Sequence, residues 1–134
     1  MLALAWRNAE PLVFTALAVF VADLLANGLK LATDRPRPYV AHPAQEPLMT
    51  TALDVSFPSG HAATAFAGAT ALYRFLPRRA VPLYLLAAAV AWSRVYVGVH
   101  YLSDVLAGAA LGVATTLLLL LAIRRLSPRV RRAG

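Results

Sequence analysis

Long apolar blocks, separated by short polar or basic segments, make up most of this chain. Crossing the ~30 Å hydrocarbon core of a bilayer takes about 20 mostly apolar helical residues. Four blocks come close to that length, at residues 11–29, 59–76, 80–97 and 102–123. The pattern predicts an all-α, membrane-spanning helical bundle of about four transmembrane helices. We expect a single domain over residues 1–134, with helices at about 11–33, 59–76, 79–98 and 101–124 and a loop at 39–58.

The four blocks differ in character. Pro11 suits the first turn of the first helix, and a cleavable signal peptide is the rival interpretation of this block. The second block is rich in Ala, Gly and Thr, which favours close helix packing over contact with lipid. In the fourth block, Gly108 and Gly112 have the spacing that lets two helices approach closely. Packing within the monomer and dimerisation are both open explanations of that spacing.

Composition supports a membrane protein. The chain is 60% hydrophobic and only 14% charged, and its mean hydropathy is +0.63, which is unusual for a soluble domain. It contains no cysteine, which excludes disulfides and thiolate metal sites. The net charge is +7, but the arginines flank apolar blocks, so we expect no nucleic-acid partner.

The basic residues are distributed unevenly between the two ends of the predicted helices. Lys30, Arg35, Arg37 and Arg94 lie at one end. The other end has nine, namely Arg7, Arg74, Arg78, Arg79, Arg124, Arg125, Arg129, Arg131 and Arg132. Basic residues near helix ends favour the cytoplasm. We therefore expect a multi-pass protein of the cell membrane, with both termini cytoplasmic.

Polar residues outside the flanks form three clusters, at residues 30–38, 57–61 and 93–104. They fall at the end of the first helix, the start of the second, and the junction of the third and fourth. In an antiparallel run of four helices these positions share one membrane surface. The charge bias makes that surface the extracytoplasmic one.

Each cluster suits a phosphate group. Arginine binds phosphoryl oxygens with two parallel charged hydrogen bonds. Ser59 is a good N-cap, and Gly60 lets the start of the second helix approach an anion. His100 and Asp104 are four residues apart, so the carboxylate can orient the ring and leave one nitrogen free as a nucleophile or base.

The three clusters together resemble the signature of the type 2 phosphatidic acid phosphatase superfamily. The match consists of Lys30, Arg37 and Pro38, then Pro58, Ser59, Gly60 and His61, then Ser93, Arg94, His100 and Asp104. The resemblance implies that His100 attacks phosphorus, that Asp104 orients it and that His61 protonates the leaving oxygen. It also implies phosphate binding by Lys30, Arg37, Ser59, Gly60 and Arg94.

The resemblance implies a lipid phosphatase without cofactor or metal. Its substrate would be a lipid phosphomonoester or diphosphate, and we expect a polyprenyl diphosphate or polyprenyl-linked phosphate. A phosphatidate or phosphatidylglycerol phosphate phosphatase is the alternative. A catalytically silent membrane scaffold is the alternative from another class.

The sequence departs from the family pattern at its start. Membrane members commonly have two helices before the one that carries the lysine, and here that helix is the first. Three explanations are open: the chain is a minimal natural form, its start site is misassigned, or it is a fragment. We expect additional N-terminal helices or a homo-oligomer to cover the lipid-facing side of the core.

Four further polar residues fall outside the signature. Asp23 and Asn27 share a helix face with Lys30, and we prefer a structural role for them over direct substrate contact. Arg35 is either a site residue or a solvated or headgroup contact. His42 is expected to be solvated.

Overall fold

The protein is a bundle of helices. The computed structural model describes residues 2–44, 46–48 and 55–126, with the backbone alone for residues 2–8. Four long helices and two short ones run in the order α1 (Leu2–Thr33), α2 (Pro38–Ala41), α3 (Gly60–Tyr73), η1 (Pro77–Arg79), α4 (Ala80–Tyr96) and α5 (Leu102–Leu126). The predicted all-α class with four principal helices is confirmed.

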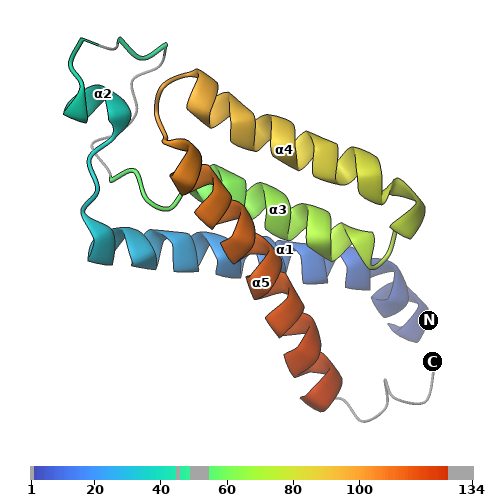
Figure 1. Ribbon diagram of the computed structural model, residues 1–134. Coiled ribbons are helices and arrows are strands. Elements are labelled where there is room, and N and C mark those ends of the chain that lie inside the picture. Colours follow the sequence, from blue (N-terminus) through green and yellow to red (C-terminus); the bar gives the residue numbers. More distant parts are fainter. Residues whose placement is uncertain (1, 45, 49–54, 127–134) are drawn as a thin grey trace.

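Helix α3 lies at the centre of the bundle. It packs against α1, α4 and α5, and α5 crosses it obliquely (Figure 1). The end of α1, the start of α3, the end of α4 and the start of α5 all lie at the same end of the molecule, on the left in Figure 1. The three polar clusters of the sequence therefore meet there.

Two predicted helix boundaries were wrong. Helix α1 begins at Leu2 and contains Pro11 in its interior, because the residues before the proline are mostly strong helix formers. Helix α3 ends at Tyr73, where the backbone N–H groups of Phe75 and Leu76 both bond to the Leu72 carbonyl. Leu76 precedes Pro77, and a residue before proline disfavours helical geometry. The short helix α2 was not predicted and lies within the expected loop.

Within the part of the chain that the structure describes, two stretches are long and apolar enough to cross a membrane, Ala9–Ala41 and Leu102–Leu126. Helix α3 has 14 residues and rises only about 21 Å at 1.5 Å per residue. Its central position explains how a short helix is accommodated, because neighbouring helices surround it.

The core of the described bundle is built from small side chains. Leaving glycines and prolines aside, its buried apolar residues are alanines except for Phe14, Val99 and Val105. Large apolar side chains point outward instead, such as Phe20 at 65% exposure and Leu118 at 65%. Small residues inside and large ones outside are typical of helices that pack in a bilayer, where lipid covers the outer surface.

Gly108 and Gly112 form the closest contact between α5 and α3. A Cβ atom at Gly112 would lie 2.1 Å from the Ala63 carbonyl oxygen, and one at Gly108 would lie 2.3 Å from the Ser59 carbonyl oxygen. Both positions face backbone, which cannot move aside easily. The spacing of these glycines therefore serves packing within the monomer.

We expect Gly112→Ala to destabilise the bundle by about 1–3 kcal/mol, because overpacking forces the two backbones apart. Gly28→Ala is the matched control, since nothing lies within 4 Å of a Cβ at that position. Thermal unfolding of both variants in detergent measures the difference. Equal midpoints for Gly112→Ala and the wild type would contradict the close approach.

Candidate active site

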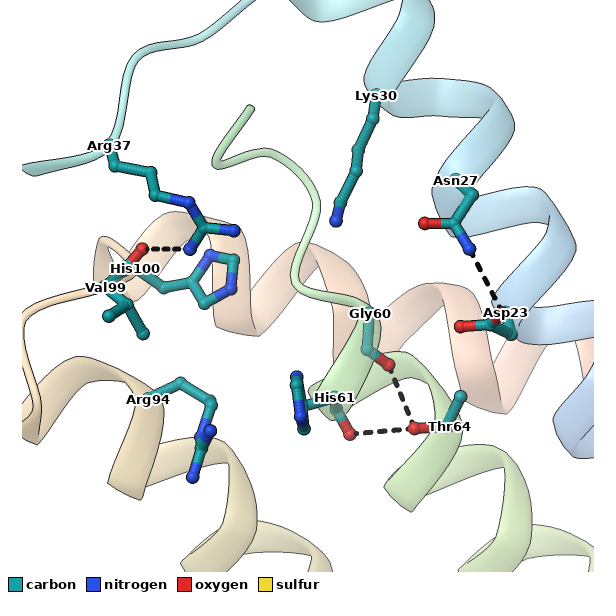
Figure 2. Close-up of a pocket in the computed structure, with 10 residues that line it drawn as sticks. All are labelled: Asp23, Asn27, Lys30, Arg37, Gly60, His61, Thr64, Arg94, Val99 and His100. Atoms are coloured by element: carbon teal, nitrogen blue, oxygen red, sulfur yellow. Dashed lines mark hydrogen bonds between the residues drawn. The ribbon is translucent and has the colours of Figure 1, made fainter. Parts of the chain in front are cut away.

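A pocket of about 330 Å³ opens where the helix ends converge. Residues from all three polar clusters and from α1 line it: Asp23, Asn27, Lys30, Arg37, Gly60, His61, Thr64, Arg94, Val99 and His100. Figure 2 shows Lys30 and Arg37 entering from one side and Arg94 and His61 from the other, with His100 beside Arg37. Three cationic side chains thus surround two histidines.

The turn between α4 and α5 sets the position of His100. Gly98 has a φ of +78°, a left-handed conformation that glycine adopts without steric cost. The chain then doubles back, and the N–H groups of Val99 and His100 both donate to the Arg94 carbonyl at 3.2 Å. His100 therefore lies in the turn before α5, and not on a helical turn with Asp104 as the spacing suggested.

The first cluster is tied to this turn. Asp34, with a φ of 41°, ends α1 in the left-handed conformation common after helices. The chain then brings Arg37 to the turn, where its guanidinium donates to the Val99 carbonyl at 2.8 Å. Arg37 is only 5% exposed. Its anchored guanidinium forms part of the pocket floor.

The second cluster starts α3 at the pocket. Ser59 is the N-cap residue, and its hydroxyl accepts from the Ala62 N–H. Its own N–H donates to the Asp104 carbonyl at 3.0 Å, which ties α3 to α5. A Cβ at Gly60 would make only an ordinary 3.8 Å contact with Asp23. The space over Gly60 therefore belongs to the pocket, at a helix N-terminus that favours anions.

Asp104 is fully buried behind the pocket, and four groups surround its carboxylate. Arg35 donates to Oδ1 at 2.6 Å, and the Tyr101 N–H donates to Oδ2 at 2.9 Å. The Ser56 hydroxyl also donates to Oδ2, and the His100 ring lies next to it. A buried carboxylate requires such partners, because desolvation without them is costly.

His100 faces Asp104 through Nδ1, which lies 3.5 Å from Oδ2. This distance is longer than a typical hydrogen bond of about 2.7–3.2 Å, and among the described residues Nδ1 has no hydrogen-bond partner. Burial of the ring lowers the pKa of His100 to about 4, the Arg37 guanidinium adds to the lowering, and Asp104 opposes it. Such a pKa leaves the ring neutral near pH 7, with a free lone pair on one ring nitrogen.

Six of the eight site residues expected from the sequence line the pocket: Lys30, Arg37, Gly60, His61, Arg94 and His100. Ser59 and Asp104 lie behind it, where the first caps α3 and the second faces His100.

The sequence did not reveal Arg35 and Ser56 as partners of Asp104. Arg35 also stacks on the Tyr101 ring, 4.2 Å from its centroid, so it contacts two residues of the third cluster. The sequence contained one usable signal, because a buried aspartate needs a cation and Arg35 is an arginine outside the signature. Nothing in the spacing pointed to Ser56.

The described residues include no group of three or more His, Cys, Asp or Glu side chains that could hold a metal ion. The charges that would face an anion in the pocket are those of Lys30, Arg37 and Arg94. Such fixed cations supply the charge stabilisation that phosphoryl transfer requires.

Known proteins resemble this chain over most of its length. A family model described as the PAP2 superfamily matches residues 11–128. A decaprenylphosphoryl-5-phosphoribose phosphatase of Mycobacterium tuberculosis is 41% identical over 112 residues, which cover 83% of this chain and 60% of that protein. The chain spans between 42% and 60% of the length of the curated relatives it matches.

Two solved structures resemble the fold. The crystal structure of Aquifex aeolicus LpxE superposes with a TM-score of 0.74 at 32% identity, covering 83% of this chain and 67% of that one. A transmembrane PAP2-type phosphatidylglycerolphosphate phosphatase from Bacillus subtilis gives 0.62 at 28% identity, covering 86% and 60%. Together with the apolar spans, these likenesses identify a membrane protein.

The electrostatics of the pocket predict how His100 titrates. Histidine NMR spectra of the protein in detergent should show it titrating near pH 4, with His100→Ala identifying the signal. Arg35→Gln should raise this pKa, because an Asp104 carboxylate without its guanidinium partner stabilises the imidazolium more strongly. Titration at the ordinary value of 6.5 or above in the wild type would contradict the site as described.

Proposed function

This chain belongs to the PAP2 superfamily, and from that membership we propose that it hydrolyses a membrane lipid phosphate with His100 as the nucleophile. The observation that carries the proposal is the pocket itself. It brings Lys30, Arg37 and Arg94 together around His61 and His100. A phosphoryl group with its developing charge fits such a cationic pocket.

The proposed reaction has two steps. Nδ1 of His100 faces Asp104, so Nε2 attacks phosphorus, and the bond from phosphorus to the leaving oxygen breaks. His61 gives its proton to that oxygen. Water then attacks the phosphohistidine, His61 takes the proton of this water, and phosphate leaves with His100 restored. The cations of the pocket hold the phosphoryl oxygens in both steps, which requires no metal ion.

The proposed substrate is a polyprenyl diphosphate or a polyprenyl-linked phosphate. The relative from Mycobacterium tuberculosis, named for a decaprenylphosphoryl sugar phosphate, supports this choice. The solved phosphatase named for phosphatidylglycerolphosphate supports the competing glycerophospholipid. The pocket residues described above contact phosphate in both cases, so the assay must include both lipids.

Purified protein in detergent with EDTA should release phosphate from lipid phosphates, fastest from the polyprenyl substrates. We expect His100→Ala to reduce the rate about a thousandfold or more, because the nucleophile is gone. His42→Ala is the matched control, since that exposed loop histidine lies outside the pocket. Wild-type release by His100→Ala would refute the mechanism, and no release from any lipid would favour the silent scaffold.

We also propose that both termini are cytoplasmic and that the pocket opens on the extracytoplasmic face. The nine to four distribution of basic residues supports this orientation. A lipid carrier that has delivered its cargo outside the cell would present its phosphate to a site on that face.

Cysteine labelling tests the orientation, because the chain has no cysteine of its own. Gln45 lies outside the described residues, whereas its neighbour Ala44 is described and exposed. We expect Ala44→Cys to react with a membrane-impermeant maleimide in intact spheroplasts. Arg78→Cys, exposed at the opposite end, should react only after permeabilisation. The reverse pattern would place the pocket in the cytoplasm.

A further inference from the structure

The pocket has two chemically different sides. In Figure 2 His100 and Arg37 lie on one side, while Asp23 and Asn27 lie on the other, beyond His61. His100 and Arg37 are each 5% exposed, whereas Asp23, Asn27 and His61 are exposed. Arg37 gives the buried side its charge, while Lys30 enters between the two sides (Figure 2). The open side contains the only carboxylate among the described residues that line the pocket.

Next to Lys30, the open side presents three hydrogen-bond acceptors. The Asn27 amide donates to Oδ2 of Asp23 at 3.1 Å, which fixes the carboxylate and leaves the amide oxygen as an acceptor. The Thr64 hydroxyl donates to the Gly60 carbonyl at 3.0 Å, so its lone pairs also remain available. We call these three residues, Asp23, Asn27 and Thr64, the acceptor wall.

In-line displacement places the leaving group next to this wall. When His100 attacks phosphorus, the leaving oxygen departs on the far side of the phosphoryl group. His61, the proposed proton donor, lies between His100 and the acceptor wall (Figure 2). The part of the leaving group attached to that oxygen therefore faces Asp23.

We propose that the acceptor wall is a leaving-group subsite that selects a hydroxyl-bearing sugar or polyol phosphate lipid over a lipid diphosphate. This inference rests on the proposed function and narrows its substrate. Hydroxyls donate to the carboxylate, the amide oxygen and the threonine oxygen. In a diphosphate the leaving group is itself a phosphate, whose oxygens only accept hydrogen bonds and whose charge is repelled by Asp23.

Within the proposed polyprenyl class, the subsite distinguishes the two substrates. With a polyprenylphosphoryl sugar phosphate, His100 attacks the terminal phosphate group, and the bond from its phosphorus to the sugar oxygen breaks. His61 protonates that oxygen, and the remaining sugar hydroxyls contact the acceptor wall. With a polyprenyl diphosphate, the anionic polyprenyl phosphate would have to leave past Asp23. Asp23 thus determines specificity, in contrast to the structural role preferred from the sequence.

The first test compares two lipids with the same polyprenyl chain, one a diphosphate and the other a phosphoryl-pentose phosphate. The wild type should have the higher kcat/KM on the pentose phosphate. Asp23→Asn should reduce that preference about tenfold, mainly by gaining activity on the diphosphate. Glu10→Gln is the matched control, because it removes a carboxylate from the same helix at its pairing with Arg74, outside the pocket. An unchanged preference in Asp23→Asn would overturn the subsite.

The second test does not depend on turnover. In the His100→Ala background, thermal midpoints are measured with inorganic pyrophosphate and with ribose 5-phosphate, with and without Asp23→Asn. Ribose 5-phosphate should stabilise the protein with Asp23 more than pyrophosphate does, and Asp23→Asn should reduce or reverse the difference. If the proteins with and without Asp23→Asn showed the same shifts of the thermal midpoint with both ligands, or no shifts at all, the proposed subsite would be wrong.

The two tests distinguish a failure of the proposed subsite from a failure of the proposed function. Discriminating binding without phosphate release from any lipid would contradict the proposed function alone. Phosphate release with a preference that Asp23→Asn does not change would contradict the subsite alone.

Discussion

The site depends on the contacts of one buried carboxylate, that of Asp104. A charge without solvent access needs partners, and here they come from different parts of the chain. Arg35 follows α1, Ser56 precedes α3, and His100 ends the turn after α4. This one carboxylate therefore joins the first and third clusters to Ser56, the residue directly before the second cluster, and it also lies beside the ring that is proposed to attack phosphorus.

Close helix packing makes that convergence possible. The Ser59 N–H reaches the Asp104 carbonyl at 3.0 Å because α5 presents Gly108 to the start of α3, with no side chain between the two backbones. A bilayer provides no hydrophobic force between helices, so small residues that allow backbone contact contribute much of the packing. The glycines that hold α3 against α5 thus also fix the helix start that faces the pocket.

Much of the fold and the site was predictable from the sequence, for identifiable reasons. The hydropathy pattern predicted the four principal helices. Because consecutive helices run antiparallel, their order predicted that the three polar clusters lie at one end of the bundle. The spacing of His100 and Asp104 gave their pairing. However, spacing did not show that the turn at Gly98 holds His100 outside the helix. It also did not show that Arg35 pairs with Asp104, since the two are 69 residues apart and meet only through the fold.

We propose that this convergence makes His100 a phosphorus nucleophile. Rapid acid-free quenching of the enzyme with labelled lipid phosphate, followed by peptide mass spectrometry, tests it most directly. We expect an acid-labile phosphoryl group on His100 that is absent from the His100→Ala protein. A phosphoryl group found on His61 instead would reverse the roles of the two histidines and contradict the account.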